Sequence, residues 1–223
     1  MIVGVLLAAG ASTRMGRPKA LLSAGGESFI AGGIRRLWSA CDRVVVVLGA
    51  DAARIRRTTG REFEALMGAG RLTRDLAQAR DPEVHHLEAR FVVHRAWTRG
   101  MLSSARAGLR EALRGGPEAV LVLPVDHPSV RPRTIVALGR SLRAALASGR
   151  APRDRARLAV AVIPRFRRRR GHPIAISPAL ARAVCADAGA ADLSDALRRN
   201  ARQVGYIDVS DAGVVRNRNT PRD

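Results

Sequence analysis

The sequence predicts a single α/β domain with a mostly parallel sheet of about seven strands and helices on both faces. Short apolar runs, rich in β-branched residues, alternate with longer segments in which apolar residues recur at helical spacing. These runs are apolar at nearly every position, which is typical of strands buried on both faces of a parallel sheet. At 223 residues the chain is long enough for one large domain with a sizeable core. We therefore expect residues 1–223 to form one domain.

The first segment predicts a buried strand that runs into a phosphate-binding loop. Residues 2–7 are apolar, and the small residues Ala8, Ala9 and Gly10 follow them. Small side chains let a ligand lie against the backbone, and Gly10 and Gly16 are expected to permit turns closed to other residues. The rest of the loop carries hydroxyls and cations, at Ser12, Thr13, Arg14 and Lys19. Backbone N–H groups flanked by cations suit a polyphosphate.

Neither of the two common phosphate loops fits this segment. The pattern G-x-G-x-x-G fails because position 12 is not glycine, and the Walker pattern fails because Arg17 follows Gly16. Lys19 is the only lysine among the 39 basic residues. Where arginine is used so heavily, a lysine in the loop indicates a need for a compact, mobile charge. The alternative is an ordinary strand turn with solvated charges.

The later segments continue the alternation of strands and helices. We expect helices at 29–38, 51–57, 101–113, 131–147, 178–186 and 193–200, and strands at 43–49, 89–93, 119–123, 158–163, 174–176, 204–209 and 214–217. Residues 58–88 do not fit this alternation. Helical spacing within 62–79 indicates a further helix there, although Gly68 and Gly70 interrupt it. His85 and His86 are expected at the surface, because no third metal ligand is evident.

Asp126 follows the strand at 119–123, where open α/β sheets place their ligands. We expect it to hold Mg²⁺, which needs only one or two protein carboxylates when phosphates complete its shell. A turn cap before Pro128 is the alternative. Ser103 and Ser104 fit two roles equally: caps of a helix, or hydroxyls placed near a nucleotide at the helix N-terminus.

The basic run at 165–170 stands before Gly171-His172-Pro173. Such runs are usually solvated, but the motif that follows favours a loop that holds an acidic substrate. The net charge of +20 raises nucleic acid as a partner, yet the arginines are scattered and only four Phe and one Tyr are present for base stacking. We therefore expect only non-specific binding of polyanions. With two cysteines, no signal peptide and no membrane span, the expected location is cytoplasmic.

Five motifs in a fixed order carry a resemblance to a known family. They are Leu-Ala-Ala-Gly-x-x-x-Arg-Met-Gly-x-x-Lys at 7–19, Gly-Met-Leu-Ser-Ser at 100–104, Leu-Pro-Val-Asp-His-Pro at 123–128, Arg-Arg-Gly-His-Pro at 169–173, and Asn-Arg-Asn-Thr-Pro at 217–221. Together they resemble the MobA-like nucleotidyltransferases, and within that group the molybdenum cofactor cytidylyltransferase branch. The resemblance spans nearly the whole chain. Residues 58–88 are longer than the family pattern requires, so the resemblance implies an insertion there, an extra helical hairpin.

The resemblance implies a Rossmann-like domain and a Mg²⁺-dependent reaction. CMP, or another NMP, would pass from an NTP to a phosphorylated acceptor with release of pyrophosphate. By resemblance the acceptor is molybdopterin or the molybdenum cofactor, and a molybdoenzyme or its chaperone would receive the product. CTP is the favoured donor, since guanylyl-transferring relatives carry Leu-Ala-Gly-Gly where this chain has Leu7-Ala8-Ala9-Gly10.

The resemblance also implies a set of site residues. The catalytic residues are Arg14, Lys19 and Asp126. The nucleotide-binding residues are Leu7, Ala8, Ala9, Gly10, Ser12, Arg14, Gly16, Lys19, Ser103 and Ser104. The acceptor-binding residues are Arg169, Arg170, His172, Asn217 and Asn219, and the metal ligands are Asp126 and Asn219. The family pattern has Asp where this chain has Asn217 and Asn219, so a second metal carboxylate is not assumed.

Three other functions compete with this one. A sugar-1-phosphate nucleotidyltransferase would share the loop and Asp126 and differ in its acceptor pocket. A nucleotide-binding protein without turnover would bind NTP and release no pyrophosphate. A basic nucleic-acid-binding protein would bind tightly at low salt whether or not Lys19 is present.

Overall fold

A computed structural model describes residues 1–11, 17–68, 88–147 and 158–218 of the chain. Its strands are β1 (Ile2–Ala8), β2 (Ser23–Ala24), β3 (Glu27–Ser28), β4 (Arg43–Leu48), β5 (Glu88–Val93), β6 (Ala119–Pro124), β7 (Val160–Phe166), β8 (Arg169–Arg170), β9 (Ile174–Ile176) and β10 (Gln203–Asp208). Its α-helices are α1 (Phe29–Leu37), α2 (Ala52–Gly68), α4 (Met101–Leu113), α5 (Pro132–Ala147), α7 (Pro178–Ala186) and α8 (Leu193–Asn200). Three short 3₁₀-helices complete this part: η2 (Lys19–Leu21), η3 (Trp97–Arg99) and η4 (Ala212–Val215).

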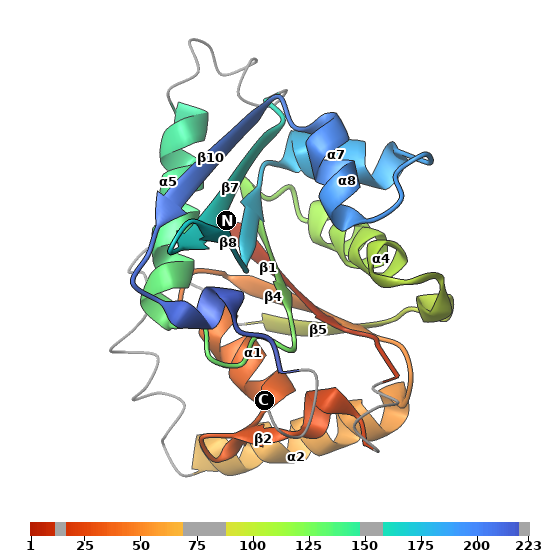
Figure 1. The fold of residues 1–223 in the computed structure, drawn as a ribbon. Coiled ribbons are helices and arrows are strands. Elements are labelled where there is room, and N and C mark those ends of the chain that lie inside the picture. Colours follow the sequence, from red (N-terminus) through yellow and green to blue (C-terminus); the bar gives the residue numbers. More distant parts are fainter. Residues whose placement is uncertain (12–16, 69–87, 148–157, 219–223) are drawn as a thin grey trace.

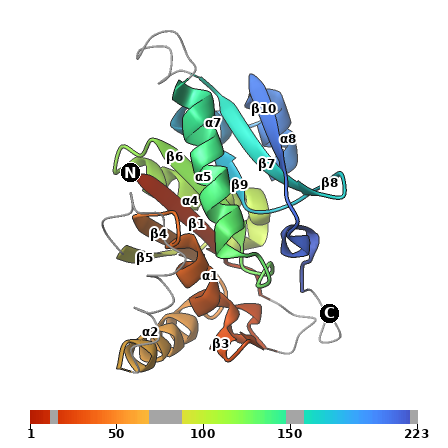
Figure 2. The same cartoon turned by 90° about the vertical axis from the view of Figure 1, so that its left-hand side faces the viewer.

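The main sheet has eight strands and is mostly parallel. Its order is β10-β7-β9-β6-β1-β4-β5, and β8 pairs with β7 beside this path. Only β9 runs antiparallel to its neighbours on the path, β6 and β7. Figures 1 and 2 show helices on both faces of the sheet. The predicted α/β fold class is therefore confirmed.

The central strand β1 divides the core into two layers, because successive side chains of a strand point to opposite faces. Ile2 and Leu6 pack in the cluster that includes α1, α2 and α5. Val3 and Val5 pack in the cluster that includes α4, α7 and α8. Every residue of β1 is buried, as a strand covered on both faces requires.

Local signals in the sequence place most helix starts. The Ser28 hydroxyl accepts a hydrogen bond from the backbone N–H of Ala31 at 3.2 Å and so caps α1. Ser177 caps α7 in the same way, through the N–H of Leu180. The predicted bounds of α5, α7 and α8 are confirmed to within one residue.

The helix predicted at 51–57 is longer in the structure and continues to Gly68 as α2. Its second half is held by α1. Phe63 packs on Trp38 with ring centroids 5.4 Å apart, and Thr59 is fully buried. Residues 58–68 of the predicted insertion therefore belong to a helix of the main fold. The rest of the insertion, with His85 and His86, lies outside the described residues.

Two other predictions near the end of the chain are wrong. The strand expected at 214–217 is instead the 3₁₀-helix η4, whose first turn is capped by the Asp211 carboxylate. The strand expected at 158–163 extends to Phe166, and the expected basic loop is a hairpin in which β7 pairs with β8. Its two turn residues, Arg167 and Arg168, have φ angles of 50° and 64°. Positive φ at both central residues is the geometry of a tight two-residue hairpin.

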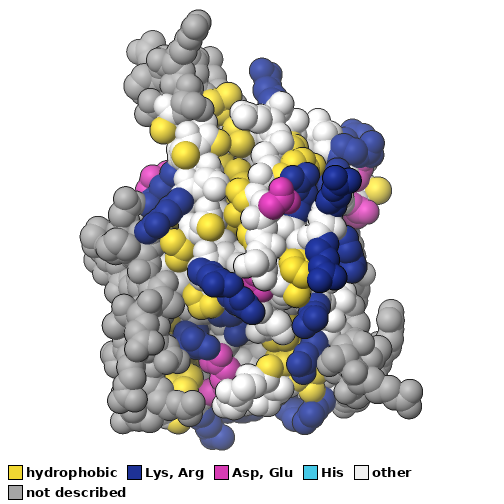
Figure 3. Space-filling model, turned by 60° about the vertical axis from the view of Figure 1, so that its left-hand side comes forward, with side chains coloured by type: hydrophobic (Ala, Val, Ile, Leu, Met, Phe, Trp, Pro, Cys, Tyr) yellow, Lys and Arg dark blue, Asp and Glu magenta, His cyan; other side chains and the backbone are white. Residues whose placement is uncertain are grey.

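The positive charge is spread over the surface. Figure 3 shows one face of the molecule, on which Lys and Arg side chains form several separate groups with hydrophobic and uncharged side chains between them. This distribution agrees with arginines scattered along the sequence. No helix in the described part of the chain is long and apolar enough to span a membrane.

The contact between α2 and the start of α1 yields a stability prediction. The Glu62 carboxylate accepts hydrogen bonds from the Ser28 backbone N–H, at 2.6 Å, and from the Ser28 hydroxyl. Glu62→Ala leaves a partly buried N–H without a partner, so it should lower the free energy of unfolding by about 1–3 kcal/mol. Urea unfolding would measure this change. Glu64→Ala, on the exposed face of the same helix, is the matched control, and equal losses for the two variants would contradict the prediction.

Candidate functional site

The site lies where the order of the strands reverses. The chain passes from β1 to β4 and β5 on one side, and β6 then pairs with the other side of β1. Both pairings of β1 are parallel, so the loops after β1 and β6 leave the same edge of the sheet. The Val125 N–H donates a hydrogen bond to the Leu7 carbonyl at 3.0 Å, which holds the starts of these two loops together. Such a switch point is where open α/β sheets bind ligands.

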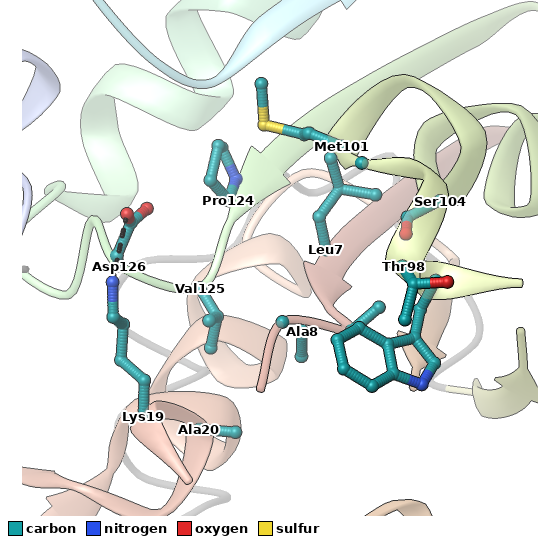
Figure 4. A pocket seen from close by; sticks show the side chains of 14 residues that line it. Leu7, Ala8, Lys19, Ala20, Thr98, Met101, Ser104, Pro124, Val125 and Asp126 are labelled. Atoms are coloured by element: carbon teal, nitrogen blue, oxygen red, sulfur yellow. Dashed lines mark ion pairs between the residues drawn. The ribbon is translucent and has the colours of Figure 1, made fainter. Parts of the chain in front are cut away.

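A pocket of about 410 Å³ opens at this point, and we call it the switch-point pocket. Residues 7–10, at the end of β1 and just beyond it, and residues 124–126, at the end of β6 and just beyond it, form two of its sides. Lys19 and Ala20 of η2 line it as well, together with Trp97, Thr98, Gly100, Met101 and Ser104. Figure 4 shows the labelled side chains around this space. Its lining is largely small or apolar, and Lys19 and Asp126 bring the charged groups.

Lys19 and Asp126 form an ion pair beside the pocket. The Lys19 Nζ lies 3.5 Å from Asp126 Oδ2, and the two side chains are 16% and 21% exposed (Figure 4). At this spacing the Lys19 cation can bind a phosphate oxygen while the Asp126 carboxylate binds a metal ion held by the same phosphate. The described residues contain no group of three or more His, Cys, Asp or Glu side chains able to hold a metal ion. The single carboxylate therefore suits a cation that keeps water and phosphate oxygens as its other ligands, as Mg²⁺ does.

Two histidines pack behind Asp126. His127 Nε2 lies 3.9 Å from Asp126 Oδ1, and the His127 and His172 rings meet edge to face with centroids 4.9 Å apart. Burial, and then the neighbouring His127, lowers the pKa of His172 to about 4. Burial also lowers the pKa of His127, although Asp126 opposes that shift. Both imidazoles are therefore neutral near neutral pH, and His172 brings no positive charge to the site.

The C-terminal segment, as far as Arg218, lies beside Asp126. The Arg218 N–H donates to the Asp126 carbonyl, and the His172 N–H donates to the Val214 carbonyl, both at 2.8 Å. A Cβ on Gly171 would stand 2.3 Å from the Val214 carbonyl oxygen, so only glycine allows this approach. The Gly-His-Pro motif and the residues around Asn217 are thus assembled next to Asp126.

The Asp211 carboxylate fixes the segment that carries η4. It accepts hydrogen bonds from the Arg131 N–H and the Thr134 hydroxyl, both at 2.8 Å, and from the Gly213 N–H at 2.9 Å. Asp211 is 2% exposed. This buried, fully used carboxylate joins the start of α5 to η4 and so supports the position of the tail.

The structure brings together seven of the predicted site residues in the switch-point pocket: Leu7, Ala8, Ala9, Gly10, Lys19, Ser104 and Asp126. Ser103 does not line this pocket, because its hydroxyl donates to the Gly100 carbonyl at 2.8 Å and lies 3.1 Å from His94 Nε2. Neither serine caps α4, whose N-cap is Gly100. Ser12, Arg14, Gly16 and Asn219 lie outside the described residues.

The prediction that Gly10 permits a turn closed to other residues is wrong. Gly10 does not have the positive φ that favours glycine, and an added Cβ would meet no atom within 4 Å. Its value at this position is the open space that it leaves at the pocket wall.

The predicted acceptor residues that the structure describes do not line the switch-point pocket. Arg169 and Arg170 are exposed on β8, and Asn217 is exposed beside Arg218. Arg170 and His172 line a second pocket, also of about 410 Å³. Met101 lines both pockets, so the two cavities adjoin at this side chain.

Sequence reasoning missed several residues of the switch-point pocket. Trp97 and Thr98 lie just before the Gly-Met-Leu-Ser motif, and Met101 lies inside it, so proximity to that motif was the available signal. Gly49 does not line the pocket but supports two residues that do, and it carried no signal because this role depends on a close approach from other parts of the chain. A Cβ at Gly49 would stand 2.3 Å from the Ala9 carbonyl oxygen and 2.6 Å from Trp97 Cγ.

This close approach predicts a large effect of Gly49→Ala. The methyl group must push away the Ala9 backbone and the Trp97 ring, and such overpacking costs about 1–3 kcal/mol of unfolding free energy. Gly60→Ala is the matched control, since Gly60 lies in α2 and an added Cβ there meets nothing. That change should instead stabilise by roughly 0.5–1 kcal/mol. Thermal or urea unfolding checks the pair, and a neutral Gly49→Ala would refute the role of this contact.

Comparison with known protein families gives one match, to the domain described as MobA-like NTP transferase, over residues 4–204. The nicotine blue oxidoreductase of Paenarthrobacter nicotinovorans is 33% identical over 222 residues, which cover 94% of this chain and 88% of that protein.

Solved structures with a similar fold include three with full or nearly full coverage. A nucleotidyl transferase from Methanothermobacter thermautotrophicus has a TM-score of 0.64 at 22% identity and covers 100% of this chain and 94% of its own. The molybdopterin-guanine dinucleotide biosynthesis protein A of Archaeoglobus fulgidus has a TM-score of 0.60 at 18% identity, with 100% and 94% covered. A manganese complex of Rv0371c from Mycobacterium tuberculosis has a TM-score of 0.59 at 18% identity, with 93% and 88% covered. At these identities the likeness concerns the fold.

Proposed function

Since this chain belongs to the MobA-like NTP transferase family, we propose that it transfers CMP from CTP to a phosphorylated small-molecule acceptor and releases pyrophosphate. The observation that carries this proposal is the Lys19–Asp126 pair beside a pocket at the switch point of the sheet. The pocket can hold the nucleotide, and the pair can serve its phosphates.

In this reaction the protein mainly has to position the two substrates and neutralise the charge of their phosphates. A phosphate oxygen of the acceptor attacks the α-phosphorus, the bond to the β-phosphate oxygen breaks, and pyrophosphate leaves with that electron pair. No covalent intermediate on the protein is needed. The two cysteines are consistent with this, because burial raises the pKa of both the Cys41 and the Cys185 thiol and so disfavours the thiolate.

A divalent cation fits the residues at this site. Asp126 would hold it, and Asn219 is proposed as a further oxygen ligand. The related manganese complex supports a divalent metal in this fold. A bound cation would neutralise phosphate charge as the pyrophosphate leaves. Lys19 would bind a phosphate oxygen as a compact point charge, and Arg14 is proposed to bind the phosphates as well.

The nucleotide is proposed to lie along residues 7–10, with Ser103 and Ser104 at the start of α4. Ala8 and Ala9 line the pocket and are nearly buried, at 3% and 5% exposure, so core packing holds this part of the lining in place. The Ala9 methyl narrows the space for the base and favours a pyrimidine over a purine. One methyl group is typically worth about 1–3 kcal/mol of discrimination.

The acceptor is proposed to lie on the side of the Gly-His-Pro motif and the tail, in contact with Arg169, Arg170, His172, Asn217 and Asn219. Molybdopterin or the molybdenum cofactor is the acceptor that the family resemblance supports, with a molybdoenzyme or its chaperone as the receiver of the product. The hydrogen bond from the Arg218 N–H to the Asp126 carbonyl supports this arrangement, because it draws the tail to the metal side of the pocket.

A second candidate is an oxidoreductase, favoured by the 33% identity with nicotine blue oxidoreductase. Hydride or electron transfer would not require the Lys19–Asp126 pair. The two functions therefore differ in what Lys19→Ala does: it would slow nucleotidyl transfer at least ~10²-fold and leave redox turnover nearly unchanged.

Lys19→Ala should lower the rate of pyrophosphate release at least ~10²-fold, the scale for losing one preorganised charged donor. Arg56→Ala, an exposed arginine of α2, is the control and should leave the rate near that of the unchanged protein. Steady-state pyrophosphate release measures both. Near-normal turnover by a folded Lys19→Ala protein would remove Lys19 from the mechanism.

Asp126→Asn should raise the Mg²⁺ concentration needed for half-maximal activity steeply, or abolish activity, because the amide keeps the shape but not the charge that retains a dication. Activity is titrated with Mg²⁺, and separately with Mn²⁺, for both proteins. Superimposable metal titrations would show that Asp126 is not the principal ligand.

The proposed function as a whole is tested by a screen of four NTPs against phosphorylated acceptors, with pyrophosphate as the readout. We expect release with CTP and a pterin phosphate, and a higher kcat/KM for CTP than for GTP, by roughly 10-fold or more for one methyl group in the pocket. Release with sugar phosphates alone would favour a sugar-1-phosphate nucleotidyltransferase. Saturable NTP binding without release under any pair would make the chain a nucleotide-binding protein.

A further inference from the structure

Strand β10 lies at one edge of the main sheet. It pairs with β7, and within the described part of the chain no strand pairs with its other side. Just past its end, the Val209 N–H donates to the Arg165 carbonyl of β7 at 2.9 Å. Successive residues of an extended strand face opposite sides, so the backbone groups of Val204 and Tyr206 point away from β7. β10 therefore presents backbone donors and acceptors that a further strand can pair with.

This edge lacks the features that usually prevent pairing between molecules. Exposed edges are commonly blunted by charged residues, proline or a bulge. Residues 203–207 include no charged residue and no proline, and their register with β7 runs without interruption. Val204 and Tyr206 are exposed by 39% and 37%. The opposite edge strand, β5, by contrast carries Glu88 and Arg90. An apolar, regular edge such as β10 favours pairing with another strand.

The sequence of β10 is complementary to itself in the antiparallel orientation. When Gly205 faces Gly205 of a second copy, Val204 stands opposite Tyr206, and Arg202, just before the strand, stands opposite Asp208. A β-branched residue opposite an aromatic one and opposite charges are both favourable cross-strand pairs. Moving the axis by one residue in either direction leaves Arg202 and Asp208 facing uncharged side chains. The charges therefore select the register centred on Gly205.

We infer that two copies of this chain associate through β10, paired antiparallel about a twofold axis at Gly205, so that the sheet continues from one copy into the other. Twofold symmetry makes each contact occur twice. The pair thus contains two contacts between Val204 and Tyr206 and two between Arg202 and Asp208. This association does not rest on the proposed function.

The Asp208 carboxylate can accept a second arginine. It accepts two hydrogen bonds from Arg165, at 3.0 and 2.8 Å, and its side chain is still 70% exposed. A carboxylate has about four lone-pair sites, so it can also meet Arg202 of the second copy. The net charge of +20 on each copy opposes association. At about 0.15 M salt, however, exposed charges more than about 8 Å apart are largely screened.

Association through β10 also changes the second pocket. Val204 and Tyr206 line this pocket, and their side chains share one face of the strand because they are two residues apart. In the antiparallel pair, Tyr206 of the second copy stands beside Val204 on that face. Each copy thus adds a side chain to the rim of the other copy's pocket.

The test measures the mass of the full-length protein against its concentration by sedimentation equilibrium, at physiological salt. One strand pair makes a small interface, and small interfaces are typical of weak complexes, so the range runs from about 1 to 300 µM. The average mass should rise with concentration from that of one chain toward that of two. A mass that stays at one chain over the whole range would overturn the inference.

Reversing the end charges tests the register. Arg202→Asp and Asp208→Arg each turn both attractive end pairs into like-charge pairs, so each should weaken self-association at least ~5-fold. A mixture of the two variants forms mixed pairs with opposite charges at both ends, so its affinity should return to near that of the unchanged protein. Arg56→Asp, at an exposed arginine of α2, makes the same change in net charge and should not weaken association.

Three outcomes of this comparison would contradict pairing through β10. They are self-association of the single variants as tight as in the unchanged protein, a mixture no tighter than the single variants, and an equal loss in Arg56→Asp. Because no nucleotide is present, none of these results bears on pyrophosphate release, so the inference and the proposed function fail or stand separately.

Discussion

The parallel pairing of β1 with β6 is the constraint on which the rest of the site depends. It puts the loops after Ala8 and Pro124 at one edge of the sheet, and the hydrogen bond from the Val125 N–H to the Leu7 carbonyl sets their spacing. Lys19 and Asp126 can meet at 3.5 Å only because these two exits are adjacent. Burial of β1 on both faces makes a shift in its register costly, since a slip of one residue would exchange the two halves of the core.

The side of Asp126 that faces the Gly-His-Pro motif and the tail, where the acceptor is proposed to lie, is built by a different kind of contact. Close backbone approaches and one buried carboxylate replace the regular ladder there. Gly171 lets the Val214 carbonyl come near, and Asp211 ties η4 to the start of α5. The Arg218 N–H then reaches the Asp126 carbonyl. This side therefore depends on contacts between segments far apart in the chain, and two of them need a particular residue, Gly171 and Asp211.

The electrostatics of the two sides also differ. Around Asp126 the buried imidazoles of His127 and His172 are neutral, because burial lowers the pKa of both rings. Lys19 is then the nearby cation in the described part of the switch-point pocket. The arginines lie farther out, on the β7–β8 hairpin, where Arg165 and Arg170 stack over Tyr206. On the proposed division of the site, the local charge of Lys19 would bind the nucleotide, and the acceptor would lie on the side where the arginines stand.

The sequence by itself determined the fold class and most element bounds, because these depend on local periodicity. It also indicated the pocket residues at the ends of β1 and β6, because open α/β sheets bind ligands at the carboxyl ends of their parallel strands. Only the tertiary structure decided the length of α2, which Phe63 and Glu62 stabilise against α1. It also decided that residues 212–215 form a 3₁₀-helix, that Gly49 faces Ala9 and Trp97, and that Met101 joins two pockets. Helical spacing within 62–79 indicated a helix there, but its continuity with 52–57 depends on the contact with α1. The positions of Gly49 and Met101 likewise depend on contacts between segments distant in sequence, and such contacts leave no periodic signal in either partner.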